Sequence, residues 1–327
     1  MKPINVFSMF DGMSCGQIAL EKAGIKVGTY HASEIDKYAS AITTKNYPFT
    51  FQMGDVTKLK DWRLEYIRDE IGIDLVIGGS PCQGFSFAGN QLNFEDPRSK
   101  LFFDFVRVLK ILKPKYFLLE NVRMKQESQD IISEYMGVEP VAINSNLVSA
   151  QNRHRLYWTN IPFNIPEDKG IVLADILEDG ITDREKSHCL DANYFKGGNL
   201  KSYFEKHRRQ LVFKSMTEVR TPEANQIRYK HKRETGKDWS PRNMRHLVER
   251  NDDKTNALTA SITKQHVIKR TYNEDISYRK LLPVECERLQ TVPDGYTEGV
   301  SNTQRYRMLG NGWTVDVIAH IFKGITV

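Results

Sequence analysis

The strongest constraint on the fold is a regular alternation of apolar runs and helical segments in the first 120 residues. Short apolar runs that we expect to form strands occupy residues 4–7, 27–31, 74–77 and 116–119. Helical spacing of apolar side chains covers residues 17–23, a segment from about residue 37, and residues 101–112, which end before Pro114. Strands that alternate with helices predict an α/β fold, in which a mostly parallel, doubly wound sheet has helices on both faces.

Three polar or glycine-rich motifs follow predicted strands in this region. They are FDGMSCG at residues 10–16, GGSPCQG at residues 78–84 and ENV at residues 120–122. In open α/β sheets, ligands bind beyond the carboxyl ends of the strands. The three motifs therefore predict a ligand site at one edge of the sheet.

The regular alternation fades at about residue 162 and returns near the C-terminus. Residues 165–275 are polar and irregular, whereas residues 278–289 and 314–322 again show helical spacing. We interpret this as a discontinuous first domain of residues 1–163 and 277–327, which carries the three motifs. Residues 164–276 form a second, smaller and less regular domain.

The positive charge of the chain is concentrated in the second domain. Residues 201–250 contain 14 lysines and arginines against 6 aspartates and glutamates, a balance of +8, while the whole chain carries only +6. A polyanion such as nucleic acid is the natural partner of such a segment. From charge alone, a solvated charged face is an equally good interpretation.

The cysteines argue against a disulfide framework or a zinc site. Cys15, Cys82, Cys189 and Cys286 are widely scattered and form no CxxC pair.

No apolar run approaches the roughly 18 residues of a membrane span, and residues 1–12 lack the apolar stretch of a signal peptide. We expect a reducing, cytoplasmic setting, with association with the nucleoid and no membrane.

Individual residues in these motifs have chemical and structural interpretations. Cys82, in a turn after a strand, would be a partly exposed thiol near backbone donors, as a nucleophile requires, although a lone cysteine is more often inert. Glu120 could donate a proton at a strand end, or be a structural carboxylate. If residues 151–158 form a strand, Arg153 and Arg155 share a face and could hold a carbonyl or phosphate, unless this is simply an edge strand.

Taken together and in order, the motifs resemble those of the DNA cytosine carbon-5 methyltransferases along the whole chain. The matching segments are FDGMSCG, SEID, GDV, GGSPCQGFS, ENV, QNRHR, RKLLPVECERLQTVPDGYT and QRYRMLGNGWTVDVIAHI. The similarity is to bacterial or phage enzymes, while FDG and the tryptophan of GNGW are reminiscent of the catalytic domains of animal de novo methyltransferases. Met13, Ser14 and Cys15 depart from the usual FxGxGG loop.

The resemblance implies a fold, a reaction and catalytic residues. The fold is the Rossmann-like fold of S-adenosylmethionine-dependent methyltransferases with a target-recognition domain. Cys82 would add to carbon 6 of a flipped cytosine, Glu120 would bind ring nitrogen 3 and Arg155 the base carbonyl, with Arg153 beside it. Carbon 5 would then accept the methyl group.

The resemblance also implies ligands. S-adenosylmethionine would be the cofactor, S-adenosylhomocysteine the product, and no metal would be needed. Phe10 would pack against adenine, Glu34 bind the ribose and Asp55 the adenine amino group. The full set of expected cofactor contacts is Phe10, Asp11, Gly12, Gly16, Glu34, Ile35, Asp55, Val56, Ser80, Pro81, Leu101, Asn311 and Trp313.

The expected partner is double-stranded DNA with a specific short target sequence, bound by a monomer, as in restriction-modification. Residues 87–100 would close over the flipped base. The expected DNA contacts are Ser86, Arg98, Lys100, Gln151, Lys196, Arg242 and Arg245. Two alternatives are an RNA (tRNA) cytosine-5 methyltransferase and a catalytically silent DNA-binding regulator of the same fold. A nicotinamide dehydrogenase would need a GxGxxG motif, which the sequence lacks.

Overall fold

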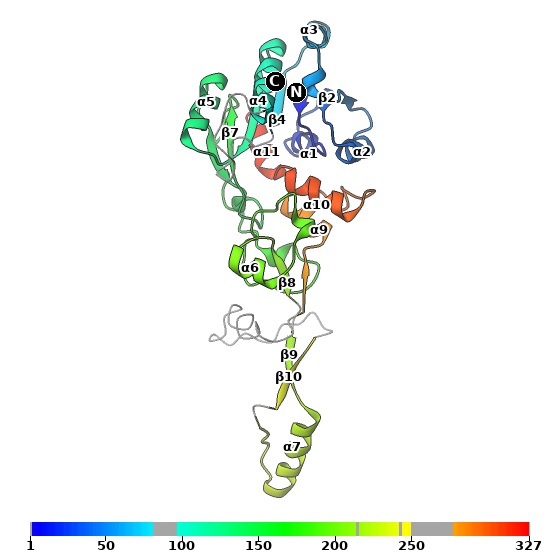
Figure 1. The fold of residues 1–327 in the computed structure, drawn as a ribbon, viewed down its shortest axis with the longest axis vertical. Coiled ribbons are helices and arrows are strands. Elements are labelled where there is room, and N and C mark those ends of the chain that lie inside the picture. The colour runs from blue at the N-terminus through cyan, green and yellow to red at the C-terminus, as the bar shows by residue number, and fades with distance from the viewer. Residues whose placement is uncertain (1, 81–96, 214–215, 242–243, 250–276, 327) are drawn as a thin grey trace.

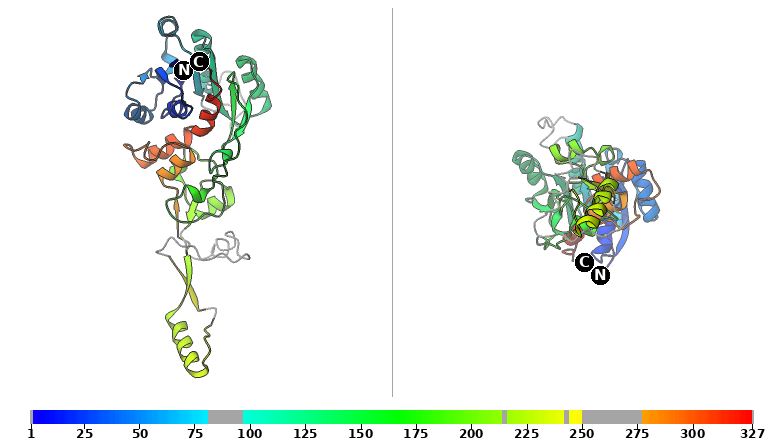
Figure 2. Two further views of the ribbon diagram at one scale, coloured as in Figure 1. Left: turned by 180° about the vertical axis from the view of Figure 1, so that it is seen from behind. Right: turned by 90° about the horizontal axis from the view of Figure 1, so that it is seen from below.

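The computed structural model describes residues 2–80, 97–213, 216–241, 244–249 and 277–326. Most of these residues form one body around a sheet, from which a narrow extension projects along the long axis (Figure 1). The chain ends marked N and C lie close together at the opposite end of the molecule (Figure 1 and, from behind, Figure 2).

The body is built on a seven-stranded sheet with the order β3-β2-β1-β4-β5-β7-β6. The five strands from β3 to β5 are parallel to their neighbours, whereas β7 is antiparallel to both β5 and β6. This confirms the expected mostly parallel sheet. The strands are β1 (Ile4–Met9), β2 (Val27–Ser33), β3 (Phe51–Gln52), β4 (Leu75–Gly79), β5 (Tyr116–Val122), β6 (Val141–Asn144) and β7 (His154–Thr159).

Helices cover both faces of the sheet, as the sequence predicts. Buried side chains of α1, α2 and α11 belong to one hydrophobic cluster, and those of α3, α4 and α5 belong to another. The sheet thus separates two cores, each closed by its own helices. The helices are α1 (Cys15–Lys22), α2 (Lys37–Asn46), α3 (Asp61–Tyr66), α4 (Pro97–Leu112), α5 (Gln126–Met136) and α11 (Val315–Phe322), with short helical turns η1 (Val56–Lys58), η2 (Ile67–Ile71) and η4 (Ser145–Leu147).

The C-terminal part of the chain returns to the body, but not in the predicted form throughout. The expected single helix over residues 278–289 is wrong: β11 (Tyr278–Lys280) pairs with β8 (Leu211–Phe213), and helix α9 (Pro283–Leu289) follows. Proline favours the first turn of a helix and holds the preceding residue extended, so the helix begins at Pro283. Helix α10 (Asn302–Asn311) then leads to α11, which packs against α1.

The segment of residues 164–213 is less regular than the body around the sheet. It contains the short turns η5 (Leu173–Asp175) and η6 (Tyr194–Lys196), helix α6 (Leu200–Lys206) and strand β8. A small cluster of Tyr203, Leu211 and Phe213 packs within it. Leu173 and Tyr194, by contrast, belong to the core cluster of the catalytic body, so this part of the domain is firmly joined to the sheet.

The projecting extension, which we call the arm, comprises residues 216–241 and 244–249. Strands β9 (Met216–Arg220) and β10 (Arg245–Glu249) form an antiparallel pair, and helix α7 (Pro222–Thr235) lies at the tip (Figure 1). The sequence reading did not predict this helix. Its boundary signals are nevertheless present: Thr221 accepts a hydrogen bond from the Ala224 amide, Pro222 occupies the first turn, and Gly236 ends the helix with φ 72°.

Candidate active site

The carboxyl ends of β1, β2, β4 and β5 meet at one edge of the sheet and carry the predicted motifs. In the pairing of β4 with β5, Gly79 lies opposite Glu120. The neighbouring residues are also joined, because the Asn121 amide donates to Ser80 Oγ over 3.1 Å. The segment that leads to Cys82 therefore starts directly beside Glu120.

Glu120 is held between a guanidinium and an indole. Arg155 Nε lies 2.8 Å from Glu120 Oε1, and Trp313 Nε1 donates to Glu120 Oε2 over 3.2 Å. The Glu120 and Arg155 side chains are only 11% and 14% exposed. The structure thus brings together three predicted site residues from β5, β7 and the segment before α11.

Gly79 makes this close approach possible. A Cβ atom at this position would lie 2.9 Å from Trp313 Nε1, closer than real Cβ contacts allow, and 3.0 Å from Glu120 Oε2, which is tighter than most. Any larger residue would therefore push the indole or the carboxylate away. The glycine next to Ser80 sets the spacing of the site.

The electrostatics of Arg155 follow from its partner. Burial alone would lower the pKa of its guanidinium, but the Glu120 carboxylate, with smaller contributions from Cys189 and Tyr157, outweighs this and raises the pKa. Arg155 therefore stays charged at the bottom of the site. Its Nη1 also donates to the His154 carbonyl at 2.8 Å, which fixes the guanidinium further. A fixed, partly buried cation suits a carbonyl oxygen.

Arg153 lies differently from the prediction. Its guanidinium is 3% exposed and donates to the carbonyls of Leu190 at 2.9 Å and Gly312 at 2.8 Å. It also contacts Cys189 Sγ at 3.5 Å, and burial followed by the nearby Arg155 lowers its pKa. Because its donors are taken by protein acceptors, we assign Arg153 a positioning role in place of the predicted catalytic contact.

Gln151 is also turned inward and does not fit the predicted contact with DNA. Its side chain is fully buried, and its amide donates to the Leu289 carbonyl at 2.7 Å and to Gln290 Oε1 at 2.9 Å. Its oxygen accepts from the Leu190 amide at 3.3 Å. Gln151 therefore links β7 to helix α9 and to the second domain.

The loop after β1 adopts an unusual backbone that its neighbours hold in place. Phe10 and Ser14 have φ angles of 55° and 61°, which non-glycine residues adopt only at a cost. The Gly12 amide donates to Glu34 Oε2 over 2.7 Å, while Glu34 Oε1 accepts from the Ile35 amide at 2.8 Å. Glu34 thus fixes the loop from the end of β2.

Asp11 supports this loop from below. Its carboxylate accepts hydrogen bonds from Tyr30 at 2.8 Å and from Ser14. Burial raises the pKa of Asp11 to about 6, although hydrogen bonds from Ser14, Ser8 and Tyr30 counteract part of the effect. This inward orientation favours a supporting role over the expected contact with a cofactor.

Gly16 allows helix α1 to pack closely against the sheet. A Cβ atom there would lie 2.5 Å from Ile77 Cδ1 and 2.6 Å from the Tyr30 hydroxyl, so α1 can approach the sheet only with glycine.

Asp55 caps η1 by accepting from the Thr57 amide at 3.0 Å, and hydrogen bonds from Thr57 lower its pKa. Val56 is buried and Ile35 is 79% exposed.

The C-terminal motif reaches the first loop, which is the condition for Asn311 to lie near a cofactor. Cys15 Sγ lies 3.9 Å from the Trp313 carbonyl oxygen, and the Tyr296 hydroxyl donates to the Met13 carbonyl at 2.7 Å. Asn311 ends α10 with an exposed side chain. Residues nearly 300 positions apart therefore share one edge of the sheet.

The family model for C-5 cytosine-specific DNA methylases matches residues 4–326. The chain belongs to this family. The methylase acts on carbon 5 of cytosine in DNA, which confirms the leading interpretation of the sequence over the RNA-directed and silent alternatives.

Known relatives cover nearly the whole methylase. The orphan methyltransferase M.SPRI of Bacillus phage SPR is 25% identical over 99% of this chain and 97% of its own. The type II methyltransferase M.HhaI of Haemophilus parahaemolyticus is 25% identical over 98% of this chain and 94% of its own.

Solved structures share the fold of the methylase at low sequence identity. The Entamoeba histolytica methyltransferase EhMeth has a TM-score of 0.64 at 15% identity, covering 99% of this chain and 98% of its own. A mutant of DNMT2 from Spodoptera frugiperda has a TM-score of 0.60 at 17% identity, covering 98% of this chain and 99% of its own. The expected methyltransferase fold is therefore confirmed.

Several predicted site residues of the methylase are not among those that the contacts above bring together. Pro81, Cys82, Ser86 and Arg242 lie outside the described residues, as does most of the predicted closing loop, residues 87–96. The side chains of Arg98 and Arg245 are likewise not described. Lys100 and Lys196 are exposed, on α4 and η6, and Leu101 is half-buried on α4.

The structure adds residues that the sequence reading did not single out. Tyr30 and Ser14 hold Asp11, Asn121 holds Ser80, and Cys189 contacts Arg153. Tyr30 lies on strand β2, which ends just before the motif residue Glu34, but no sequence motif marks it. In the part of the chain that the structure describes, no cluster of potential metal ligands occurs, and no helix is long and apolar enough to cross a membrane.

Proposed function

We propose that the methylase takes its methyl group from S-adenosylmethionine and methylates a cytosine flipped out of duplex DNA. The observation that carries this proposal is the arrangement of Arg155, Glu120 and Trp313 beside the strand end that leads to Cys82. An ion pair of low exposure at the carboxyl edge of a parallel sheet is suited to hold a polar ring. In the proposal, residues 1–163 and 277–327 perform catalysis, and residues 164–276 recognise the target.

The edge formed by the first loop fits an adenosyl group. A Cβ atom at Gly12 would meet no other atom within 4 Å, so the space above the loop is open, and half-buried Phe10 offers a ring for stacking. Glu34 accepts three backbone hydrogen bonds out of about four that a carboxylate can accept, which leaves capacity for a ribose hydroxyl. Asp55, Val56, Ser80, Pro81, Leu101, Asn311 and Trp313 would complete the contacts.

When bound, S-adenosylmethionine supplies an electrophilic methyl group for carbon 5. The chain's own residues prepare the base. In the proposed reaction the Cys82 thiolate forms a bond to carbon 6, which makes carbon 5 nucleophilic. Glu120 holds a proton at ring nitrogen 3, and Arg155 binds the base carbonyl. Carbon 5 later loses its proton to a base, and the bond between Cys82 sulfur and carbon 6 breaks to release methylcytosine.

Contacts with DNA are proposed for basic residues of both domains. In the proposal, a monomer binds a short, specific site on duplex DNA, and the basic charge of residues 201–250 supports binding to this polyanion. The candidate contacts are Arg98, Lys100, Lys196, Arg242 and Arg245. Such a methylase would act in the cytoplasm, at the nucleoid or on phage DNA, as part of a modification system. The relatives named above, which are methyltransferases of a phage and of a type II system, support this setting.

Covalent trapping tests the role of Cys82. A duplex with 5-fluorocytosine at the target position has no carbon-5 proton to lose, so with cofactor present we expect a complex that survives denaturant. Cys82→Ala should form none, whereas the control Cys286→Ala, on helix α9, should keep it. Absence of a complex with a wild-type protein that methylates ordinary duplex DNA would overturn the assignment. Transfer of labelled methyl to tRNA but not to duplex DNA would overturn the proposed substrate.

A further inference from the structure

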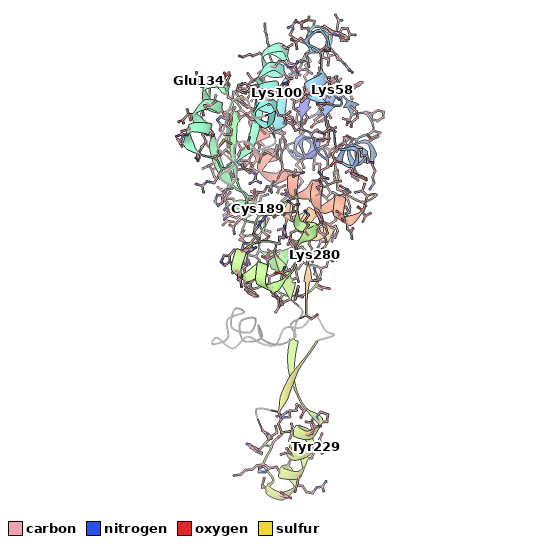
Figure 3. All side chains as sticks on the ribbon, viewed as in Figure 1. Lys58, Lys100, Glu134, Cys189, Tyr229 and Lys280 are labelled. Atoms are coloured by element: carbon pink, nitrogen blue, oxygen red, sulfur yellow. The ribbon has the colours of Figure 1, made fainter. Side chains whose placement is uncertain are left out.

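The arm is built as a self-contained unit that presents one helix to its surroundings. Its hydrogen bonds join residues near in sequence: Arg220 Nε donates to Ser240 Oγ at 2.8 Å, and Thr221 accepts from the Ala224 amide at 3.1 Å. Tyr229, labelled on α7, lies at the end of the molecule farthest from the sheet (Figure 3). Among the described residues, no side chain of the arm belongs to the hydrophobic clusters of the body.

One face of α7 is anchored to the segment that follows the helix. Ala224 is fully buried, the Arg228 guanidinium pairs with both oxygens of Asp238 at 2.6 and 2.5 Å, and the rings of His231 and Trp239 lie 5.3 Å apart. These residues recur at spacings of four and three, which places them on a single helix face. This inner face holds the helix in position, and it neutralises the charge of Arg228.

The opposite face is exposed and carries cations and hydrogen-bond donors. Gln226, Tyr229, Lys230 and Arg233 follow the spacing i, i+3, i+4 and i+7 and are all exposed, Tyr229 by 63%. Within the described residues no ion pair is recorded for Lys230 or Arg233, in contrast to Arg228. Glu223 and Glu234 lie along one flank. Amide, phenol, ammonium and guanidinium donors are the groups that proteins use to contact phosphate oxygens.

We propose that this outer face of α7 binds the phosphate backbone of duplex DNA beside the target site. The inference rests on the proposed function, because it requires that duplex DNA is the substrate. Charge complementarity supports it, since residues 216–249 contain 8 lysines and arginines against 5 aspartates and glutamates, a balance of +3. Because the arm stands at the far end from the sheet (Figure 1), the contact falls on flanking base pairs rather than on the flipped base.

The contact adds affinity without reading sequence. Phosphate contacts set position and carry no base information, and each one makes binding more sensitive to salt. Lys230 and Arg233 lie one turn apart and would meet two phosphates. Their removal should therefore lower the slope of log affinity against log salt by about 2.

The test compares short and long duplexes. With a target sequence identified by bisulfite sequencing, affinity is measured by fluorescence anisotropy for a duplex limited to the target and for one with long flanks on both sides. For Lys230→Ser/Arg233→Ser we expect affinity for the long duplex to fall about 10- to 100-fold at 50 mM salt, with the reduced salt slope. Binding and methylation of the short duplex should not change.

Two further variants make the result specific. Lys26→Ser/Lys60→Ser removes the same charge from exposed positions on the catalytic body and should leave the preference for the long duplex intact. Lys230→Arg/Arg233→Lys keeps both charges and should bind like the wild type. Equal protection of the α7 amides from hydrogen exchange in all variants would show that the arm helix remains folded.

Other outcomes would overturn the inference while leaving the proposed function standing. Unchanged affinity of the arm variant for the long duplex would remove the contact, although trapping by 5-fluorocytosine would still succeed. Equal losses on both duplexes would place the arm at the target itself. A loss confined to structured RNA, or a change of oligomeric state without a change in DNA affinity, would assign the face to another partner.

Discussion

The active site and the arm differ in how far along the chain their contacts reach. In the site, Trp313 contacts Glu120 across 193 positions and Arg153 contacts Gly312 across 159. In the arm, Arg228 contacts Asp238 across only 10 positions. The first region is assembled from the whole chain, whereas the second closes on itself.

Two aspartates show the electrostatic side of the same difference. Asp11, buried beneath the first loop, has its pKa raised to about 6 by burial. Asp238, in the exposed arm, has its pKa lowered to about 2 by hydrogen bonds from Arg228. Chemistry requires groups fixed in a dry site by many segments, while contact with phosphates requires only charge, exposure and reach.

The largest effect is expected at Glu120. Glu120→Gln removes the carboxylate between Arg155 and Trp313 and should lower the rate of methyl transfer by about 10²–10⁴. Affinity for duplex DNA should change little, because phosphate contacts lie elsewhere. Single-turnover transfer of labelled methyl measures the rate, with exposed Glu127→Gln on α5 as the matched control. A rate within a few fold of the wild type would show that the site does not depend on its long-range contacts.

A smaller effect should appear in the pH dependence of stability at Asp11. Because its pKa is higher in the folded chain than the ordinary 3.8, the native state binds more protons between these values, and stability falls as pH rises through about 6. The difference corresponds to about 3 kcal/mol at most. Urea denaturation of Asp11→Asn and of the wild type should therefore show the variant gaining relative stability from pH 4.5 to 7.5. A constant difference would contradict the burial of an ionisable carboxyl.

The smallest effect is expected in the arm. Asp238→Asn weakens an exposed pair, whose contribution is present above pH 4 and is lost only as pH falls toward 2. Global unfolding at pH 7 should be unchanged, while amide exchange in α7 becomes faster. Glu234→Gln on the same helix serves as the control. A lower unfolding midpoint for the whole methylase would show that the arm is coupled to the core after all.

Much of the fold was readable because local pattern and tertiary structure agree there. The runs at residues 4–7, 27–31 and 116–119 lie within strands, and the run at residues 74–77 enters its strand at Leu75. The helices after these strands begin within a few residues of the predicted positions. Helix α7 was not predicted because its segment lacks an apolar stripe, although Thr221, Pro222 and Gly236 mark its boundaries. The apolar spacing predicts a helix at residues 278–280, because periodicity alone does not reveal their pairing with β8.

The sequence predicted which residues belong to the site better than it predicted where their side chains point. The motifs identify Glu120, Arg155 and Trp313, but no spacing in the sequence reveals that the three side chains touch. The same limit explains Gln151 and Arg153, where residue type suggested contact with a ligand and the fold turns both inward. Side-chain direction depends on which carbonyls lie nearby, and those belong to distant segments.

The contact between Trp313 and Glu120 also has a consequence in time. A ribosome adds about 5–20 residues per second, so Glu120 is synthesised roughly 10–40 s before the indole that holds it. During that interval a nascent methylase can expose its basic arm, yet Glu120 lacks its final partner. Methylation competence should therefore arise late in translation, when the C-terminal helices fold back onto the first loop.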